Sequence, residues 1–316
     1  MRAAVRSWIS GADTSRFPLA RLPLGVRRRP DGSHAACTRV GDRVADLRVL
    51  AEVGVFDDTG AERADLARPS LNALLARGRV VLDRVRDRAA ACLDDDPNYW
   101  DFRQRAEIFL LPADQVRLVL PVACGDYTRF AHRAPGRWAS REARAANLLV
   151  EGDADARLAI PFRGGDGEEE PDGLRPTIGI GVVIGTHDDR PFPYGLCGLA
   201  DWTGAAARGA DDLRPGRRTV VAPWITPLAA LADDSVTVEA TLTANGPARR
   251  ERVLRREGER VRGAEMLAAL RADGAVVRAG DLLGRSVAAA APPGDRWVRE
   301  DAAALSVDAW ISSAPG

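Results

Sequence analysis

The stretch that most constrains the fold is TIGIGVVIGT, which runs from Thr177 to Thr186. Between its two threonines it holds only glycine and β-branched apolar residues. A continuous apolar run of this kind, bounded by glycines and rich in isoleucine and valine, is typical of a strand inside a sheet. The chain is therefore expected to build a sheet with this segment near its centre.

The first third of the chain alternates short extended runs with turns. In LPLGVRRRPDGSHAACTRVGDRVADL, the turns RPDG and VGDR flank short extended segments, as in a small β-barrel or meander. PSLNALLARGRVVLDRVRDRAAACL then changes to helical spacing. DDDPNYWDFRQR is expected to be a polar linker, and the chain then returns to strands. We place a domain boundary near residue 115, with residues 1–115 as a small N-terminal β-domain with a helix and residues 116–316 as a second domain.

The second domain continues with strands, loops and one helix. RGGDGEEEPDGLRP, at residues 163–176, predicts a long acidic loop, and YGLCGLADWTGAAARGADDL predicts a strand that runs into a helical turn. TVVAPWITPLAAL predicts a strand that ends at a Pro-Trp corner, and RAGDLLGRSVA predicts a strand after a turn. GAEMLAALRADGAVV predicts an amphipathic helix closed by Gly274. The fold class that these patterns favour is α+β, with mixed sheets.

The charged residues exclude several kinds of site. All 45 basic residues are arginine, as expected from a very GC-rich genome. Without lysine, the chain has no Schiff-base lysine, no phosphate-binding Walker lysine and no lysine acid or base. The formal net charge is zero, so the basic excess of a nucleic-acid-binding surface is missing. Arginine runs such as RRRP at residues 27–30 and RRERVLRREGERVR at residues 249–262 are interpreted as solvated faces.

The cysteines and the apolar runs indicate a cytoplasmic protein without a membrane span. The four cysteines are scattered, with no CxxC and no metal-ligand spacing, so they are expected to be buried and reduced. The N-terminal residues lack the apolar core of a signal peptide. No apolar run approaches the length that a bilayer requires.

The segment VACGDYTRFAHRAPG, at residues 122–136, has the pattern of the entrance to a metal-dependent active site with one ligand replaced. A strand of small apolar residues leads into Gly-Asp-Tyr-Thr. Arg129 then stands where a carboxylate ligand would make chemical sense.

Seven segments, in the same order from end to end, resemble fumarylacetoacetase, a hydrolase that cleaves a carbon–carbon bond in a 1,3-diketo acid. RFPLARLPLGV resembles the family's FPxxNLPYGV, VGDRVADL its IGDxxLDL, and PSLNALLARG its xxLNxFMxLG. GDYTRF is similar to GDYTDF, and LADWTGA to MNDWSAR. VVAPWITPLAAL is similar to TxSPWVVPMDAL, and VRAGDLLGRS to LRPGDLLASG. The resemblance implies a small N-terminal β-domain followed by a mixed β-roll domain that usually dimerises.

The resemblance also implies a divalent cation, held by four carboxylates, that polarises two substrate carbonyl oxygens. In this chain the four positions fall on Arg129, Thr177, Gly179 and Asp201, so only Asp201 keeps a carboxylate. The family's catalytic histidine falls on Gly136, with His132 nearby. Because one carboxylate does not hold a hard dication against water, we expect no metal cofactor; Mg²⁺ or Ca²⁺ would belong only to a hydrolase whose ligands are aligned differently.

Arg129 and Asp201 are the leading candidates for the site. An arginine in place of a ligand aspartate brings a guanidinium to the vacated site, where it faces the remaining carboxylate. The pair is either a structural salt bridge or a group that binds a substrate carboxylate or enolate electrostatically. His132 is the default general base, although a histidine without an orienting partner is more often on the surface.

Further candidates line the same predicted pocket. Asp126 and Tyr127 of GDYTRF are either substrate-binding or fold-keeping residues, and Cys124 is more often buried filler than a nucleophile. Arg217, Arg218 and Thr219 follow the position of the family's lysine, so either arginine could bind an anionic substrate and Thr219 could line the pocket.

Three functions remain open from the sequence. The first is a metal-independent enzyme that acts on a small carbonyl or carboxylate compound in bacterial specialised metabolism. The second is a metal-dependent hydrolase of 1,3-diketo acids, and the third is a non-catalytic homologue that serves as a binding or scaffold subunit. The expected partners are a small-molecule substrate and a second copy of the chain, with no nucleic acid and no membrane.

Overall fold

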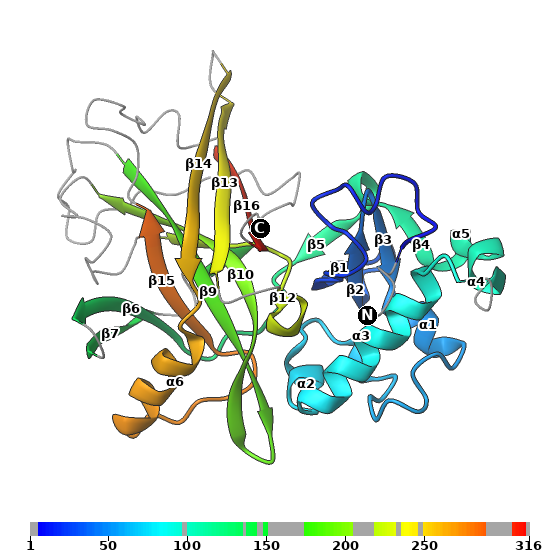
Figure 1. Cartoon of the computed structure of the whole chain (residues 1–316), viewed down its shortest axis with the longest axis horizontal. Coiled ribbons are helices and arrows are strands. Elements are labelled where there is room, and N and C mark those ends of the chain that lie inside the picture. The colour runs from blue at the N-terminus through cyan, green and yellow to red at the C-terminus, as the bar shows by residue number, and fades with distance from the viewer. Residues whose placement is uncertain are drawn as a thin grey trace.

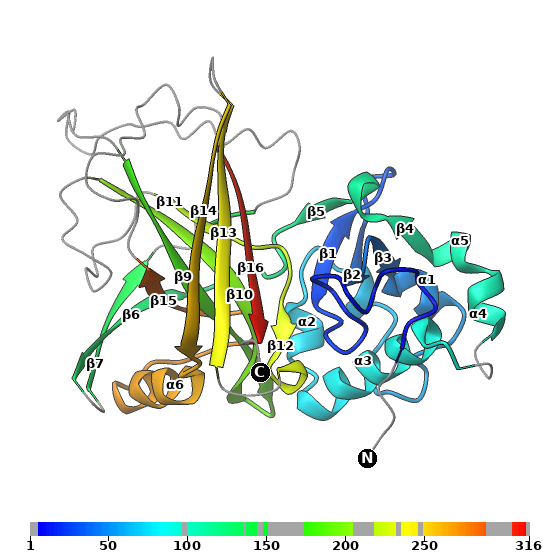
Figure 2. The same cartoon turned by 45° about the horizontal axis from the view of Figure 1, so that its top comes forward.

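The computed structural model describes residues 6–96, 100–134, 137–143, 148–150, 174–204, 218–231, 235–245, 249–288 and 305–313. The chain forms two units that lie side by side (Figure 1). The N-terminal unit combines a small sheet with short helices, and the larger unit is built around long strands (Figure 2). This mixed architecture confirms the predicted α+β class.

The small sheet of the N-terminal unit has five strands, in the order β4-β3-β2-β1-β5. Every neighbouring pair is antiparallel. Its strands are β1 (Leu24–Arg28), β2 (His34–Val40), β3 (Arg43–Asp46), β4 (Leu110–Pro112) and β5 (Arg117–Val119). The predicted turns lie between these strands, with Gly32 and Gly41 at φ of 82° and 58°, which glycine adopts without a steric penalty. Because β5 pairs with β1, this sheet includes residues just beyond the predicted boundary at residue 115.

Helices cover the N-terminal sheet. The predicted helical stretch divides at Gly78, whose φ is 88°, into α2 (Asn72–Leu75) and α3 (Arg79–Leu93). The remaining short helices are α1 (Leu47–Glu52), η1 (Asp65–Ala67), α4 (Trp100–Gln104), α5 (Ala106–Phe109) and η3 (Ala113–Gln115). The interpretation of DDDPNYWDFRQR as linker was wrong for its second half, because α4 occupies it. An aromatic contact accompanies this helix: the ring of Phe102 packs edge-on against the ring of Phe109, with the ring centroids 6.3 Å apart.

The large sheet has the strand order β7-β6-β15-β9-β10-β11-β8, with β12 (Thr226–Pro227) paired to β10. Its members are β6 (Tyr127–Ala134), β7 (Arg137–Ala143), β8 (Leu148–Val150), β9 (Leu174–His187), β10 (Arg190–Gly204), β11 (Arg218–Val221) and β15 (Leu282–Ala288). The predicted central strand is confirmed, because TIGIGVVIGT lies in β9 between β15 and β10. The predicted acidic loop ends earlier than expected, since residues 174–176 already pair with β10.

A third sheet stands beside the large one. It consists of β13 (Ser235–Asn245), β14 (Arg249–Arg260) and β16 (Leu305–Ser313), in the order β14-β13-β16. The predicted helix is confirmed as α6 (Gly263–Ala272), and Gly274 follows it with a φ of 77°. A short 3-10 helix, η6 (Leu228–Ala230), completes the described elements.

The two faces of β9 contribute to two different hydrophobic cores, because successive residues of a strand point to opposite faces. Ile178, Ile180 and Val182 pack with Met266 and Leu270 of α6. Residues of the opposite face belong to a core that continues into the N-terminal unit and includes Val183, Leu199, Tyr127, Leu282 and Leu71. The central strand is therefore buried on both faces, which explains why its sequence is apolar without alternation.

The two units also share backbone hydrogen bonds. Leu24 and Ile225 exchange N–H···O bonds of 2.9 and 2.8 Å, so β1 is bridged to the segment before β12. The ring of Trp224 lies over Gly25, where a Cβ atom would come within 2.8 Å of it. The segment TVVAPWITPLAAL is thus used inside the chain, to join the two units.

Several predictions about side-chain environment can be checked directly. All four cysteines are free thiols. Cys37, Cys92 and Cys197 are buried, as predicted, whereas Cys124 is only half-buried. The interpretation of RRRP as a solvated face was wrong for Arg27, which is 8% exposed and forms a 3.5 Å ion pair with Asp46. Within the described part of the chain, no helix combines the length and apolarity needed to cross a membrane.

Candidate functional site

Arg129 lies in β6, on the face of the large sheet that includes Tyr127 and Leu282. Parallel pairing with β15 aligns Arg129 with Gly284, and antiparallel pairing with β7 aligns it with Arg141. The side chain of Arg129 is buried, with the residue only 4% exposed. Its Nη2 donates a hydrogen bond of 3.0 Å to Oγ of Ser286. A buried guanidinium held by a hydroxyl is an orientated positive group, which is the kind of group that binds carboxylates and enolates.

The guanidinium of Arg129 contacts β15, the strand that lies between β6 and the central strand β9. Ser286 lies on β15, and its partner on the next strand is Gly179. Gly179 and Thr177 are the two positions where the family resemblance implies a metal-ligating glutamate. Arg129 and Ser286 therefore meet beside a position that would belong to the metal in the family.

Gly179 leaves no room for any side chain. A Cβ atom at this position would lie 2.7 Å from the backbone oxygen of Arg285, closer than real Cβ contacts allow. The space is taken by the backbone of β15, which cannot move aside like the end of a flexible side chain. A glutamate at this position would require β9 and β15 to separate.

Two further glycines of this face are filled by their neighbours. A Cβ at Gly284 would lie within 2.6 Å of the Tyr127 ring and hydroxyl, and a Cβ at Gly181 would lie 2.7 Å from Sγ of Cys197. The Tyr127 ring is itself 1% exposed. These contacts fill the sheet surface beside Arg129 with a tyrosine side chain and a protonated thiol rather than with carboxylates.

The residues of this site do not fit the divalent cation that the resemblance implies. The described residues contain no group of three or more His, Cys, Asp or Glu side chains placed to hold a metal. Hard dications require several oxygen ligands, whereas Arg129 brings a positive charge and Gly179 has no side chain. We therefore derive no chemical step through a metal.

Asp201 lies on β10, opposite Thr177 on one side and Thr219 on the other. Because Asp201 is two residues beyond the buried Leu199, the register places both on the same face of the sheet as Arg129. Thr219 is 2% exposed. The Asp201 side chain lies outside the described atoms, so the proposed pairing of Arg129 with Asp201 stays a prediction.

The other predicted residues divide between described and undescribed positions. His132 pairs through its backbone with Trp138, and Arg218 pairs with Trp202, but their side chains lie outside the description. Arg217 falls in residues 205–217, outside the described chain. Asp126 is exposed at the entry to β6.

Two residues that the sequence did not single out form hydrogen bonds with the backbone at the start of β6. Asp281 is 3% exposed and accepts backbone N–H bonds from Asp126 and Arg278, at 3.1 and 2.7 Å. Burial raises the pKa of the Asp281 carboxyl. Asn72 of α2 donates to the carbonyl oxygens of Ala123 and Ala279 and accepts from the Ala123 N–H.

Position within the family motifs was the signal available for both, since Asn72 stands in PSLNALLARG and Asp281 in VRAGDLLGRS. Their contacts bring three of those motifs together at the start of β6. These hydrogen bonds link the backbones of the three segments.

Cys124 does not have the environment of a nucleophile. Burial raises the pKa of its thiol to about 12, and the nearby carboxylates of Asp281 and Asp126 add to this effect. Its Sγ donates to the backbone oxygen of Asp126, at 3.0 Å. A thiol with a raised pKa is protonated at neutral pH and reacts slowly.

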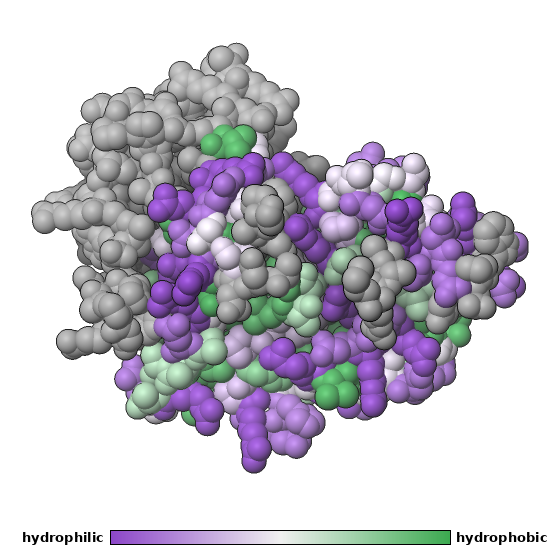
Figure 3. Space-filling view, viewed as in Figure 1, coloured by the Kyte–Doolittle hydropathy of each residue, from purple (hydrophilic) through white to green (hydrophobic). Residues whose placement is uncertain are grey.

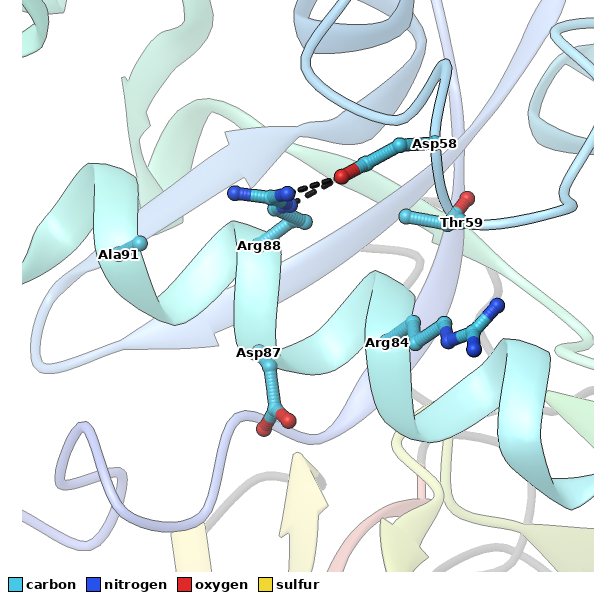
Figure 4. Close-up of a pocket in the computed structure, with 6 residues that line it drawn as sticks. All are labelled: Asp58, Thr59, Arg84, Asp87, Arg88 and Ala91. Carbon is cyan, nitrogen blue, oxygen red and sulfur yellow. Dashed lines mark hydrogen bonds and ion pairs between the residues drawn. The ribbon is translucent and has the colours of Figure 1, made fainter.

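A polar hollow of about 470 Å³ lies on the N-terminal unit, away from Arg129. It is lined by Asp58, Thr59, Arg84, Asp87, Arg88 and Ala91, and Arg88 pairs with Asp58 across it (Figure 4). The charged residues of α3 in this hollow are exposed to solvent. Exposed ion pairs of this kind contribute little to the free energy of folding. None of the residues that line the hollow has a buried side-chain N or O atom without a hydrogen-bond partner.

The comparisons with known proteins agree with the order of motifs. Residues 20–121 match the family model described as fumarylacetoacetase N-terminal. The chain is 30% identical over 172 residues to the fumarylacetoacetase of Arabidopsis thaliana, covering 51% of this chain and 39% of that protein. It is 25% identical over 278 residues to the fumarylacetoacetase of Oryza sativa subsp. japonica, covering 73% of this chain and 65% of that protein. Each match thus spans less than two thirds of the relative.

The fold has a solved counterpart. The structure is similar to the crystal structure of maleylpyruvate hydrolase from Sphingobium sp. SYK-6 in complex with manganese(II) ion and pyruvate, with a TM-score of 0.53 and 16% sequence identity. The likeness covers 93% of this chain and 98% of that one. At this level of identity it shows a shared fold.

Proposed function

The chain is a divergent member of the fumarylacetoacetase family. On this premise we propose that the protein is an enzyme that acts on a small carbonyl or carboxylate compound and needs no divalent cation. The observation that carries the proposal is the buried guanidinium of Arg129, held by Ser286 beside Gly179. It stands where the family resemblance places carboxylates around a cation.

A guanidinium can take over part of the work of a metal ion. It carries a permanent positive charge and several N–H donors in one plane, so it binds a carboxylate or an enolate oxygen with defined geometry. In a buried site this charge acts more strongly than in water. Arg129 would hold the substrate anion and stabilise the negative charge that develops on an enolate.

The remaining candidates take supporting roles in this proposal. Asp201, on the same face of the sheet, would orient Arg129 or exchange a proton with the substrate, and His132 would serve as the general base. Asp126, Tyr127, Arg217, Arg218 and Thr219 would line the substrate site. We also propose that the working form is a homodimer in the cytoplasm.

Small 2-oxo acids are suitable first probes. The maleylpyruvate hydrolase of similar fold was crystallised with pyruvate, which combines a carbonyl and a carboxylate in three carbons. The complete replacement of lysine by arginine points to a GC-rich genome and, with the altered site, to specialised bacterial metabolism.

The test is a screen of 2-oxo and 1,3-dioxo acids, with product formation followed by proton NMR before and after treatment with EDTA. We expect turnover or binding that EDTA does not change and that Arg129→Gln abolishes. Activity that EDTA removes and Mg²⁺ or Mn²⁺ restores would assign the chain to the metal-dependent hydrolases. If the protein neither binds nor turns over any of these compounds, a non-catalytic subunit is favoured.

A further inference from the structure

We propose that Ser286 is a positioning residue that fixes the Arg129 guanidinium for a substrate carboxylate, an inference that rests on the proposed function. Ser286 ends the motif VRAGDLLGRS, but the sequence alone gives it no role. Its assignment comes from the contact between two strands of the large sheet.

The side chain of Arg129 has to cross β15 to reach the centre of the sheet. Its direct partner there is Gly284, which has no side chain to block the path. The Tyr127 ring fills the space over Gly284, with its hydroxyl 2.6 Å from the place where a Cβ would be. The guanidinium is thereby directed to the next position on the same face, where Ser286 Oγ accepts its Nη2–H bond at 3.0 Å.

The backbone at Ser286 is also specialised. The pairing of β15 with β9 is regular up to Ser286 and Gly179 and then shifts between Ser286 and Ala288. Bulges of this kind redirect side chains and are common beside active sites. Because Gly179 lets the backbone of β15 approach closely, Ser286 lies nearer to β9 than a larger residue at 179 would allow.

The chemistry of serine suits this role. Its hydroxyl is neutral, so this hydrogen bond orients the guanidinium without adding a negative charge beside it. An aspartate at position 286 would add such a charge. A guanidinium is planar and rigid, so the bond from one of its N–H groups to Ser286 sets the orientation of the whole group.

A purely structural hydrogen bond is the competing explanation. It predicts that removal of the Ser286 hydroxyl lowers the thermal unfolding temperature and leaves the behaviour of bound anions unchanged. A positioning role predicts weaker anion binding, because Arg129 would remain buried but would lose the bond that sets the orientation of its guanidinium.

The experiment uses the full chain with ¹⁵N-labelled arginine, in the wild type, Ser286→Ala and Ser286→Thr. Arg129→Lys identifies the Arg129 signals by their absence. Ser33→Ala, in the turn between β1 and β2, is the matched loss of a hydroxyl far from Arg129. Two readouts are taken: the rotation of the Arg129 Nη groups by NMR, and the affinity for pyruvate by NMR titration.

We expect faster rotation of the Arg129 Nη groups and roughly tenfold weaker pyruvate binding in Ser286→Ala, because a hydrogen bond to a charged group is lost. Ser286→Thr, which keeps the hydroxyl, and Ser33→Ala should match the wild type in both readouts. Unchanged rotation and affinity in a folded Ser286→Ala protein would overturn the inference. If the wild type binds no pyruvate, the proposed function loses its support, while the rotation of the Nη groups still decides whether Ser286 orients Arg129.

Discussion

Gly179 and Arg129 both differ from the carboxylates that the family resemblance places at their positions, and the two differences depend on each other. Without a side chain at 179, β15 approaches β9 and brings Ser286 to the guanidinium. A carboxylate at position 129 alone would not replace the metal ligand that is missing at position 179. Restoring a single carboxylate therefore does not restore a metal site.

A first prediction concerns the close approach at Gly179. We expect Gly179→Ala to lower the free energy of unfolding by about 1–3 kcal/mol, because the new Cβ meets the backbone oxygen of Arg285. Gly181→Ala is the comparison on the same face of the same strand, where the nearest atoms belong to the side chains of Cys197 and Leu282 and can shift. Urea denaturation measures both. Equal losses in the two variants would contradict the assigned cause.

A second prediction concerns divalent cations. If Asp201 lies beside Arg129, the pair presents almost no net charge, whereas the family resemblance implies four negative ligands. We expect titration calorimetry with Mg²⁺ or Ca²⁺ to show no site-specific heat for the wild type. Dissociation constants in the micromolar range would reject both this prediction and the alignment of Arg129, Gly179 and Asp201 with the family's ligands.

A third prediction concerns Arg129 and Asp201 as a pair. If they face each other, Arg129→Ala and Asp201→Ala should each lower the free energy of unfolding, by about 3–5 kcal/mol, because each leaves a buried charge without its partner. Arg129→Lys should fold but bind small carboxylates poorly, since an ammonium lacks the planar fork of donors. Chemical denaturation and NMR titration test the two parts. A normal affinity of Arg129→Lys for pyruvate would remove Arg129 from the anion site.

At the scale of elements, the strand β9 and the helix α6 were predicted from sequence because their patterns are local. An apolar run with glycine boundaries and a helical stripe closed by Gly274 carry their own signal. The helix α4 was missed because Asp, Pro and Asn at the start of its segment obscured the aromatic contact of Phe102. Residues 174–176 were missed because Pro176 and its acidic surroundings favour a loop, whereas pairing with β10 extends the strand.

The site was predictable only in part, for a related reason. Arg129 could be found because GDYTRF is a contiguous motif in which a single residue departs from the pattern. Ser286 also stands in a motif, but its contact with Arg129, 157 residues away in sequence, depends on the register between β6 and β15 and could not be predicted. Asp281 and Asn72 likewise act through contacts between distant segments.

A fourth prediction follows from Asp281, which joins the start of β6 to the turn before β15. Burial raises the pKa of its carboxyl in the folded state above the unfolded value. The folded protein therefore binds a proton more readily than the unfolded chain, so this group favours folding at low pH, and the benefit is lost as pH rises through the folded pKa. We expect the stability of the wild type relative to Asp281→Asn to increase as the pH falls from 7 towards 4.

Urea denaturation of both proteins at several pH values measures this difference. Asparagine does not titrate, so the comparison isolates Asp281 from the other carboxylates. Asn72→Ala, which removes the neighbouring contacts but no titrating group, is the control and should show the same pH dependence as the wild type. A constant difference between wild type and Asp281→Asn across this range would show that the carboxyl has the same pKa in both states.

At the scale of the whole molecule, the segment TVVAPWITPLAAL packs against the N-terminal unit of its own chain. Ile225 is bridged to Leu24, and Trp224 covers Gly25 and contacts Phe17, with ring centroids 6.3 Å apart. These contacts close the boundary between the two units of one chain. On the face shown in Figure 3, the described surface is mostly hydrophilic, with hydrophobic residues in separate areas.

A fifth prediction is that the protein nevertheless forms a homodimer, through a surface other than this segment. We expect light scattering at micromolar concentration to give about twice the 33.9 kDa mass of one chain. Trp224→Ala should then weaken the fold rather than the dimer, since Trp224 packs within its own chain: its thermal unfolding temperature should fall while the folded fraction keeps the dimer mass. A folded Trp224→Ala protein with the mass of one chain would place this segment in the interface, and a wild-type mass near that of one chain would reject the dimer itself.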